Sequence, residues 1–271
     1  MLLAAVFDDQ AKAQDGSRLL QALHSEGIVT LYAHALVERE RRRRQLSVRE
    51  PFHEGMVAAA PAAAALVGAL ISLIGGPTTS AMLTLESGLV GAVRDVIEAG
   101  LDPAFLEDVA ARLRPGSFCL VAELEADEPF ALDAGIACLG GRTMRQEGCA
   151  IRLEELVLRN AEALRQSHNR LLASPPDGAS AVAASAMRRA NVAELRQYLE
   201  RARLLAAVLR RQATAKVAVL RSQAALTGGP ARQMIEARAG RARTLLEERA
   251  IRLDRLIEDI GPLLARARER H

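Results

Sequence analysis

Few residues in this 271-residue sequence have the types and the spacing that chemistry at a site requires. His34, His53 and Glu54 come nearest to a metal-binding set, because the two strands expected around them would pair and bring them together. Their spacing matches no metal motif, and the more ordinary interpretation is that all three are structural. We therefore predict no metal and no cofactor.

Other candidate positions give an equally weak signal for catalysis. Asp8 and Asp9 follow the first expected strand, where α+β proteins often place function, but acidic residues also commonly open helices. The glycines from Gly135 to Gly141 lack the spacing of a phosphate-binding loop. Neither a Ser-His-Asp triad nor a Cys-His pair is recognisable. The sequence predicts a protein that is not an enzyme and has no catalytic residue.

Composition limits the classes of protein further. Half of the residues are hydrophobic, but there is no Trp and there are only two Tyr and five Phe, so the aromatic anchors of ligand pockets are scarce. Cys119, Cys138 and Cys149 show no CxxC spacing, which favours unpaired thiols in a reducing cytoplasm. The net charge is only +3, and the arginines lie in local clusters. The surface is therefore not uniformly basic, and any charged partner has to be considered for each cluster separately.

The first half of the chain has the pattern of an α+β domain. A strand at 2–7 precedes a helix that ends near Gly27, and apolar runs at 28–37 and 45–49 predict two further strands. A helix after Asp102-Pro103, a strand at 117–124, a helix at 129–139 and a strand at 141–145 complete the order. We expect a ferredoxin-like α+β sandwich over residues 1–148.

Residues 55–98 are expected to form a helical hairpin inserted into this domain. No charged residue occurs from Gly55 to Leu85, and a Gly-Gly-Pro break divides the segment. Small residues recur every fourth position, as in a glycine zipper. The predicted membrane or self-association contact comprises Ala60, Ala64, Gly68, Ser72, Gly76, Ser80, Thr84, Gly88 and Ala92.

Two environments fit this hairpin. The first helix is long enough for a transmembrane helix, which needs to cover about 30 Å, and Leu66, Leu70, Leu73 and Ile74 would then face lipid or a neighbouring subunit. Glu86, Arg94 and Asp95 oppose insertion of the second helix, at about 2.5 to 3.5 kcal/mol each near the bilayer centre. A hairpin that lies shallow in the membrane, or one that is shielded by other subunits, is therefore expected in place of two independent spans. A tightly packed Ala-rich pair in water is the alternative.

A cluster of arginines precedes the uncharged segment. Arg41, Arg42, Arg43 and Arg44 lie in the turn between the second and third expected strands. Basic clusters beside a membrane attract anionic lipid at about 1 kcal/mol per residue, and this is the contact that we predict. A solvated turn is the alternative, and nucleic acid is disfavoured because no aromatic residues interleave to stack bases.

The second half of the chain is rich in Arg, Ala, Leu and Glu and is expected to be helical. Residues 149–180 hold a helix and a Pro-rich linker, and residues 181–271 show heptad spacing on both sides of a Gly-Gly-Pro turn. This pattern predicts a long antiparallel coiled-coil hairpin that makes the protein a homo-oligomer. Its seam residues are Leu195, Leu199, Leu209, Leu220, Leu246, Leu253, Ile257 and Ile260.

Four motifs of the first half occur in an order that resembles a known family. They are LAAVFDD at 3–9, VGALISLIGGP at 67–77, GLDPAFLEDV at 100–109 and LRPGSFCLVA at 113–122. Together they resemble a bacterial family of uncharacterised small membrane proteins over residues 1–147. The resemblance implies a ferredoxin-like domain interrupted by a glycine-rich helical hairpin, and it implies no activity. This hairpin is richer in Ala than in Gly, and the coiled coil lies outside the resemblance.

These patterns together predict a non-enzymatic structural or scaffold protein. It would associate with a membrane or with other copies through the hairpin, and it would oligomerise or capture a protein partner through the coiled coil. The alternative is a small-ligand sensor whose ferredoxin-like domain signals through the coiled coil. The N-terminus lacks the features of a secretory signal, so the expected location is the cytoplasmic face of the inner membrane, or the cytoplasm as a large oligomer.

Overall fold

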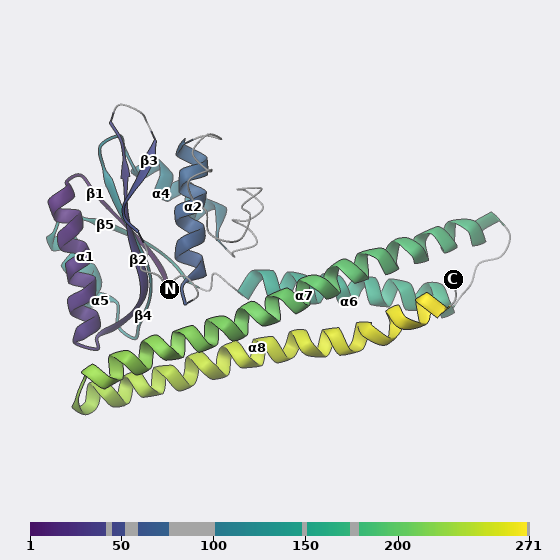
Figure 1. Cartoon of the computed structure of the whole chain (residues 1–271). Helices are drawn as coiled ribbons and strands as arrows, with labels where there is room; N and C mark the ends of the chain where they lie inside the picture. The colour runs from purple at the N-terminus through teal and green to yellow at the C-terminus, as the bar shows by residue number, and fades with distance from the viewer. Residues whose placement is uncertain (42–44, 52–58, 76–100, 148–150, 174–178, 270–271) are drawn as a thin grey trace. The chain divides into compact units, whose positions relative to one another are not determined.

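The computed structural model is an α+β structure with a five-stranded antiparallel sheet and a long helical region (Figure 1). It describes residues 1–41, 45–51, 59–75, 101–147, 151–173 and 179–269. The chain divides into two compact units. The sheet unit contains Met1–Ile151 and Gln212–Arg243, and the helical unit contains Arg152–Arg211 and Thr244–His271.

The sheet is built from strands that are far apart in the sequence. The strands are β1 (Leu2–Phe7), β2 (Val29–Arg39), β3 (Leu46–Glu50), β4 (Phe118–Ala126) and β5 (Arg142–Gln146). Their order is β3-β2-β4-β1-β5, and every neighbouring pair is antiparallel. All six residues of β1 are buried, because this strand has a neighbour on each side and packed layers on both faces.

One face of the sheet is covered by α1 (Gln10–Ser25) and α5 (Phe130–Cys138), as Figure 1 shows. Their buried residues Leu20 and Ile136 pack with Phe7 and Leu120 of the sheet. Asp9 caps the N-terminus of α1 by accepting a hydrogen bond from the Lys12 backbone N–H at 3.1 Å. That contact gives Asp9 a structural role at the end of β1.

The opposite face is covered by α2 (Pro61–Gly75) and α4 (Pro103–Arg112). Leu66 and Leu70 of α2 are fully buried in the same core as Tyr32 and Val121 of the sheet. The expectation that these leucines face lipid or a neighbouring subunit is therefore wrong. The apolar face of the sheet needs a cover, and α2 provides it.

The expectation of a transmembrane helix is also overturned. Among the described residues, no helix combines the length and the apolar character that crossing a bilayer requires. The described helix α2 covers Pro61–Gly75, which is 15 residues and corresponds to about 22 Å at 1.5 Å per residue. The second expected helix of the hairpin lies outside the described residues.

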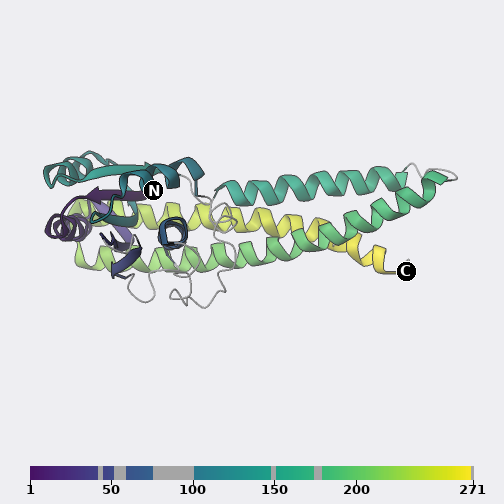
Figure 2. The same ribbon diagram turned by 90° about the horizontal axis from the view of Figure 1, so that it is seen from above.

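The remaining helices are α6 (Ile151–Ala173), α7 (Ala179–Leu226) and α8 (Gly229–Glu269). Within the helical unit, α6 runs beside α7 and α8 (Figure 2). Glu154 of α6 is fully buried, and its carboxylate receives Arg249 Nε at 2.6 Å and Arg252 Nε at 3.0 Å. The expected seam residues Leu195, Leu199, Leu209, Leu246, Leu253 and Ile260 are buried in this unit.

Candidate functional site: an acidic ladder on β4

Three carboxylates alternate along β4 and its end. Glu123 and Glu125 belong to β4, and Asp127 follows it directly. Side chains two residues apart in a strand point to the same face, and this face is the one that α2 covers. We call these three residues the acidic ladder.

Two carboxylates of the ladder, Glu123 and Asp127, are bound by the part of the two long helices that belongs to the sheet unit. We call this part, residues 212–243, the helical tip. The tip carries six basic residues and one acidic residue, whereas residues 1–151 carry thirteen basic and twenty acidic residues. Their charges are therefore opposite in sign, at net +5 and net −7. Opposite charge favours the contact between the two segments.

Lys216 of the tip binds the first carboxylate. Its Nζ lies 3.0 Å from Oε1 of Glu123, and both side chains are largely buried. The other carboxylate oxygen accepts a hydrogen bond from the backbone N–H of Ala62 in the first turn of α2, at 3.1 Å. The Lys216 ammonium also lies 4.3 Å from the centre of the Tyr32 ring, within cation–π distance.

Tyr32 binds the second carboxylate. A bulge in β2 between Leu31 and Ala33 places the Tyr32 side chain in the core of the ladder face. Its hydroxyl donates to Oε2 of Glu125 at 2.6 Å. Burial, and then the neighbouring carboxylate of Glu125, raise the pKa of Tyr32, so the phenol stays protonated and acts as a donor.

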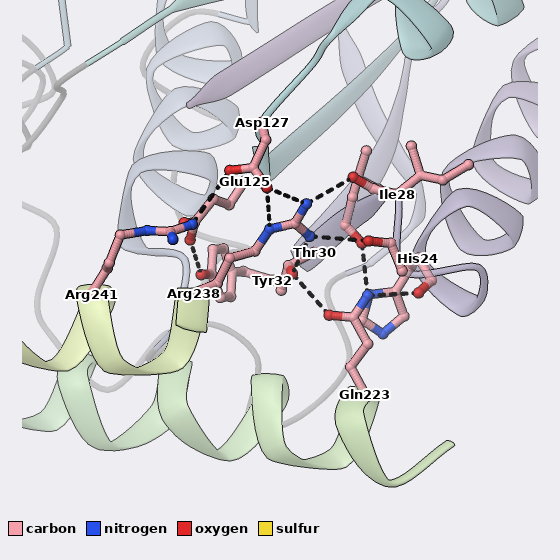
Figure 3. A network of polar contacts seen from close by, with 11 residues as sticks. His24, Ile28, Thr30, Tyr32, Glu125, Asp127, Gln223, Arg238 and Arg241 are labelled. Carbon is pink, nitrogen blue, oxygen red and sulfur yellow. Dashed lines mark hydrogen bonds and ion pairs between the residues drawn. The ribbon is translucent and has the colours of Figure 1, made fainter. Parts of the chain in front are cut away.

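Arg238 binds the third carboxylate from a fully buried position (Figure 3). Its Nη2 and Nε lie 2.8 and 3.1 Å from Oδ2 of Asp127. The same guanidinium donates to the backbone carbonyls of Gly27 and Ile28, each at 3.2 Å. Arg241, which is exposed, reaches the other oxygen of Asp127 at 3.3 Å.

Gln223 binds the backbone of the α1–β2 turn. Its Nε2 donates to the carbonyls of His24 and Val29 at 2.6 and 2.7 Å, and its Oε1 accepts from the Thr30 hydroxyl at 2.8 Å. The His24 ring in turn accepts the backbone N–H of Leu31 at its Nδ1. Burial lowers the pKa of His24, which favours the neutral ring that this acceptor role requires.

A glycine allows the close approach of the tip. Gly27 has φ +78°, in the left-handed region, and a Cβ at this position would lie 3.3 Å from Ala231 Cβ and Ile235 Cδ1. Leu220 and Ile235 of the tip are fully buried in the same core as Tyr32. The tip is thus packed as part of the sheet core, and the apolar contacts of Leu220 and Ile235 keep its polar side chains in position.

The chemistry of this site is recognition between two segments of one chain. The Lys216 ammonium and the Arg238 guanidinium pair with carboxylates of the ladder, and the Gln223 amide pairs with backbone carbonyls, which fixes the tip on the sheet. In the part of the chain that the structure describes, no group of three or more His, Cys, Asp or Glu side chains is arranged to hold a metal ion.

The residues predicted from sequence lie elsewhere. In and before α2, Ala60 is buried and Ala64 and Gly68 are half-buried. Ser72 also belongs to α2, while Gly76, Ser80, Thr84, Gly88 and Ala92 lie outside the described residues. Arg41 is exposed and lies two residues after the end of β2, and Arg42, Arg43 and Arg44 lie outside the described residues.

The other predicted positions are spread over the structure. His34 contacts Gln21 at 3.4 Å, while His53 and Glu54 lie outside the described residues. Leu220 is buried in the helical tip. Ile257 is half-buried, and its neighbour Leu256 is buried instead.

The sequence reasoning missed the acidic ladder and its partners, although each left a signal. The ladder appears as carboxylates at alternating positions in an otherwise apolar strand. Arg238 lies three residues after Ile235 and four before Ala242, so it occupies a seam position of the heptad pattern. A charged residue at a seam position indicates a buried ion pair.

The fold defines the class of this protein. It is an α+β protein in which an antiparallel sheet is combined with long helices. No protein-family model, curated protein or solved structure matches the chain.

Proposed function

We propose that this chain is a non-enzymatic scaffold protein that self-assembles through its helical unit. The observation that carries the proposal is the exposure of large apolar side chains on the outside of that unit. Leu204 and Val208 lie one turn apart on α7, with 69% and 47% of their surface exposed, although the opposite side of the same helix is buried at Ala202, Ala206 and Leu209. An exposed apolar stripe beside a packed seam favours contact with a second copy.

The buried polar groups support a structural role. Arg238, Lys216 and Gln223 are bound to the sheet, and Glu154 is bound to Arg249 and Arg252 in the helical unit. Groups that hold one another in this way are not available to a substrate. The site geometry therefore favours assembly over catalysis.

The finer description of the fold belongs to the same proposal. We take the sheet unit to be a ferredoxin-like sandwich in which β1-α1-β2 and β4-α5-β5 are the two halves and β3 is an added edge strand. The strand order, with β1 and β4 adjacent at the centre, supports this assignment. The resemblance of residues 1–147 to a bacterial family agrees with it.

We take α7 and α8 to form an antiparallel coiled-coil hairpin. The free thiols at Cys119 and Cys138 fit a cytoplasmic location.

The test is the oligomeric state of the full chain by size-exclusion chromatography with light scattering. We expect an oligomer that dissociates on dilution. Covering a Leu or Val side chain contributes about 1.5 to 3 kcal/mol, and a symmetric contact contains each residue twice. L204Q/V208Q should therefore weaken association at least about 100-fold, or ~2.8 kcal/mol.

The matched control is Leu226→Gln at the end of α7, which changes a leucine that is 89% exposed. It should leave the oligomer intact. A full chain that is monomeric at every concentration would overturn the proposal. So would equal weakening by the control and by L204Q/V208Q.

A further inference from the structure

A second charged feature lies at the other end of β2 and is not explained by self-assembly. The last residue of β2 and the turn between α4 and β4 are hydrogen-bonded side by side. Arg39 N–H donates to the carbonyl of Ser117 at 3.0 Å, and Arg39 Nη1 donates to the carbonyl of Leu113 at 2.6 Å. Two turns that are distant in sequence therefore form one surface.

This surface brings arginines together. Gly116 has φ +88°, and a Cβ there would lie 2.7 Å from Cγ of Arg41, so the Arg41 side chain runs across the turn that also contains Arg114. Arg41 and Arg114 are both exposed. We call Arg39, Arg41 and Arg114 the arginine corner.

Several other exposed arginines of the sheet unit are paired with a carboxylate, whereas the two exposed arginines of the corner are not. Arg49 is paired with Glu38, Arg112 with Asp108 and Arg145 with Asp133. Arg41 and Arg114 have no carboxylate partner among the described residues, and the Arg39 Nε atom is buried without a hydrogen-bond partner there. Two like charges without a counter-charge repel each other, so the corner is suited to an anionic partner that neutralises both.

We infer that the arginine corner is a peripheral binding surface for the anionic headgroups of a lipid bilayer. The corner consists of exposed turns, and guanidinium groups pair readily with phosphate. A membrane surface attracts such arginines without any matching groove. Nucleic acid fits less well, because no aromatic side chain stands among these arginines to stack a base. This contact adds to the proposed self-assembly and does not depend on it.

The experiment is sedimentation of the full chain with vesicles of phosphatidylcholine alone or mixed with phosphatidylserine. We expect binding to the anionic vesicles only, and loss of binding in high salt because exposed charges are screened. R41Q/R114Q should bind about 30-fold more weakly, which corresponds to ~2 kcal/mol from two arginines at a surface.

The matched control is Arg221→Gln. Arg221 is also exposed and has no partner among the described residues, but it lies in the helical tip near Gln223, which binds Val29 at the other end of β2. It should bind anionic vesicles like the unchanged chain.

Three results would each overturn the inference. They are equal binding to neutral and anionic vesicles, absence of binding to anionic vesicles at low salt, and an equal loss in R221Q. Tighter binding to duplex DNA than to anionic vesicles at the same salt would also overturn it, in favour of nucleic acid. Circular dichroism of the variants shows whether each is folded before its binding is compared.

Discussion

Replacing Arg238 by Met should destabilise the sheet unit far more than the same change at Arg241. Both guanidinium groups bind Asp127, but the Arg238 side chain is 1% exposed and that of Arg241 is 59% exposed. The two positions therefore separate a buried contact from a surface contact to one carboxylate.

The magnitude follows from what each arginine leaves behind. Without Arg238, the buried carbonyl of Gly27 and the partly buried carbonyl of Ile28 lose their bonds to the guanidinium, and a buried unsatisfied group costs about 1 to 3 kcal/mol. Asp127 is 47% exposed, so its carboxylate is still solvated and still bound to Arg241, and it contributes little to the loss of stability. We expect a loss of about 2 to 5 kcal/mol for R238M and under about 1 kcal/mol for R241M.

The assay is urea unfolding followed by circular dichroism, together with amide hydrogen exchange at the start of β2. R238M should lower the unfolding midpoint and increase exchange near Val29 to Leu31, whereas R241M should change neither appreciably. Equal midpoints for the two variants would refute the reasoning, because the buried contacts of Arg238 would then contribute nothing beyond a surface ion pair.

Two further predictions concern the helical unit. Burial, and then the charge of Arg188, lower the pKa of His168. The contribution of the neutral ring to stability is therefore complete above the unfolded pKa of about 6.5 and is lost as pH falls below that value. The variant H168Q should reduce the loss of thermal stability between pH 7.5 and 5, and an unchanged pH profile would contradict this. Replacing the buried Glu154 by Gln removes the carboxylate charge that the buried Arg249 binds and should cost about 3 to 5 kcal/mol. The variant R252Q, at a position 53% exposed, should cost under about 1 kcal/mol by urea unfolding.

Local patterns predicted the elements of the sheet unit well. The apolar run at Leu2–Phe7, the Asp102-Pro103 helix start and the break at Pro115-Gly116 all mark elements that the structure contains. Each of these signals acts within a few residues, so the sequence alone displays it.

The environment of α2 was not predictable from the same kind of pattern. A segment without charges suits lipid and suits a protein core equally, since both exclude water. What decides between them is the apolar face of the sheet, where Leu66 and Leu70 pack. That face is assembled from strands distant in sequence, so no local pattern in 55–85 reveals it.

The acidic ladder and Arg238 each leave a local signal in the sequence, but no local signal shows which residues pair with each other. Glu123 and Lys216 are 93 residues apart, and Asp127 and Arg238 are 111 residues apart. No spacing rule connects residues at such separations. The bulge that aims Tyr32 at Glu125 is likewise a property of strand pairing, which the sequence of β2 alone does not specify.

The polar contacts of the helical tip explain how its position on the sheet is selected. Apolar contacts of Leu220 and Ile235 are non-directional, and a heptad pattern repeats every seven residues, so they allow the tip to slide along the sheet. Gln223 and Arg238 bind backbone carbonyls between His24 and Val29, and a shift of one helical turn would leave those groups buried and unpaired. The apolar residues thus supply attraction, and the buried amide and guanidinium specify one register.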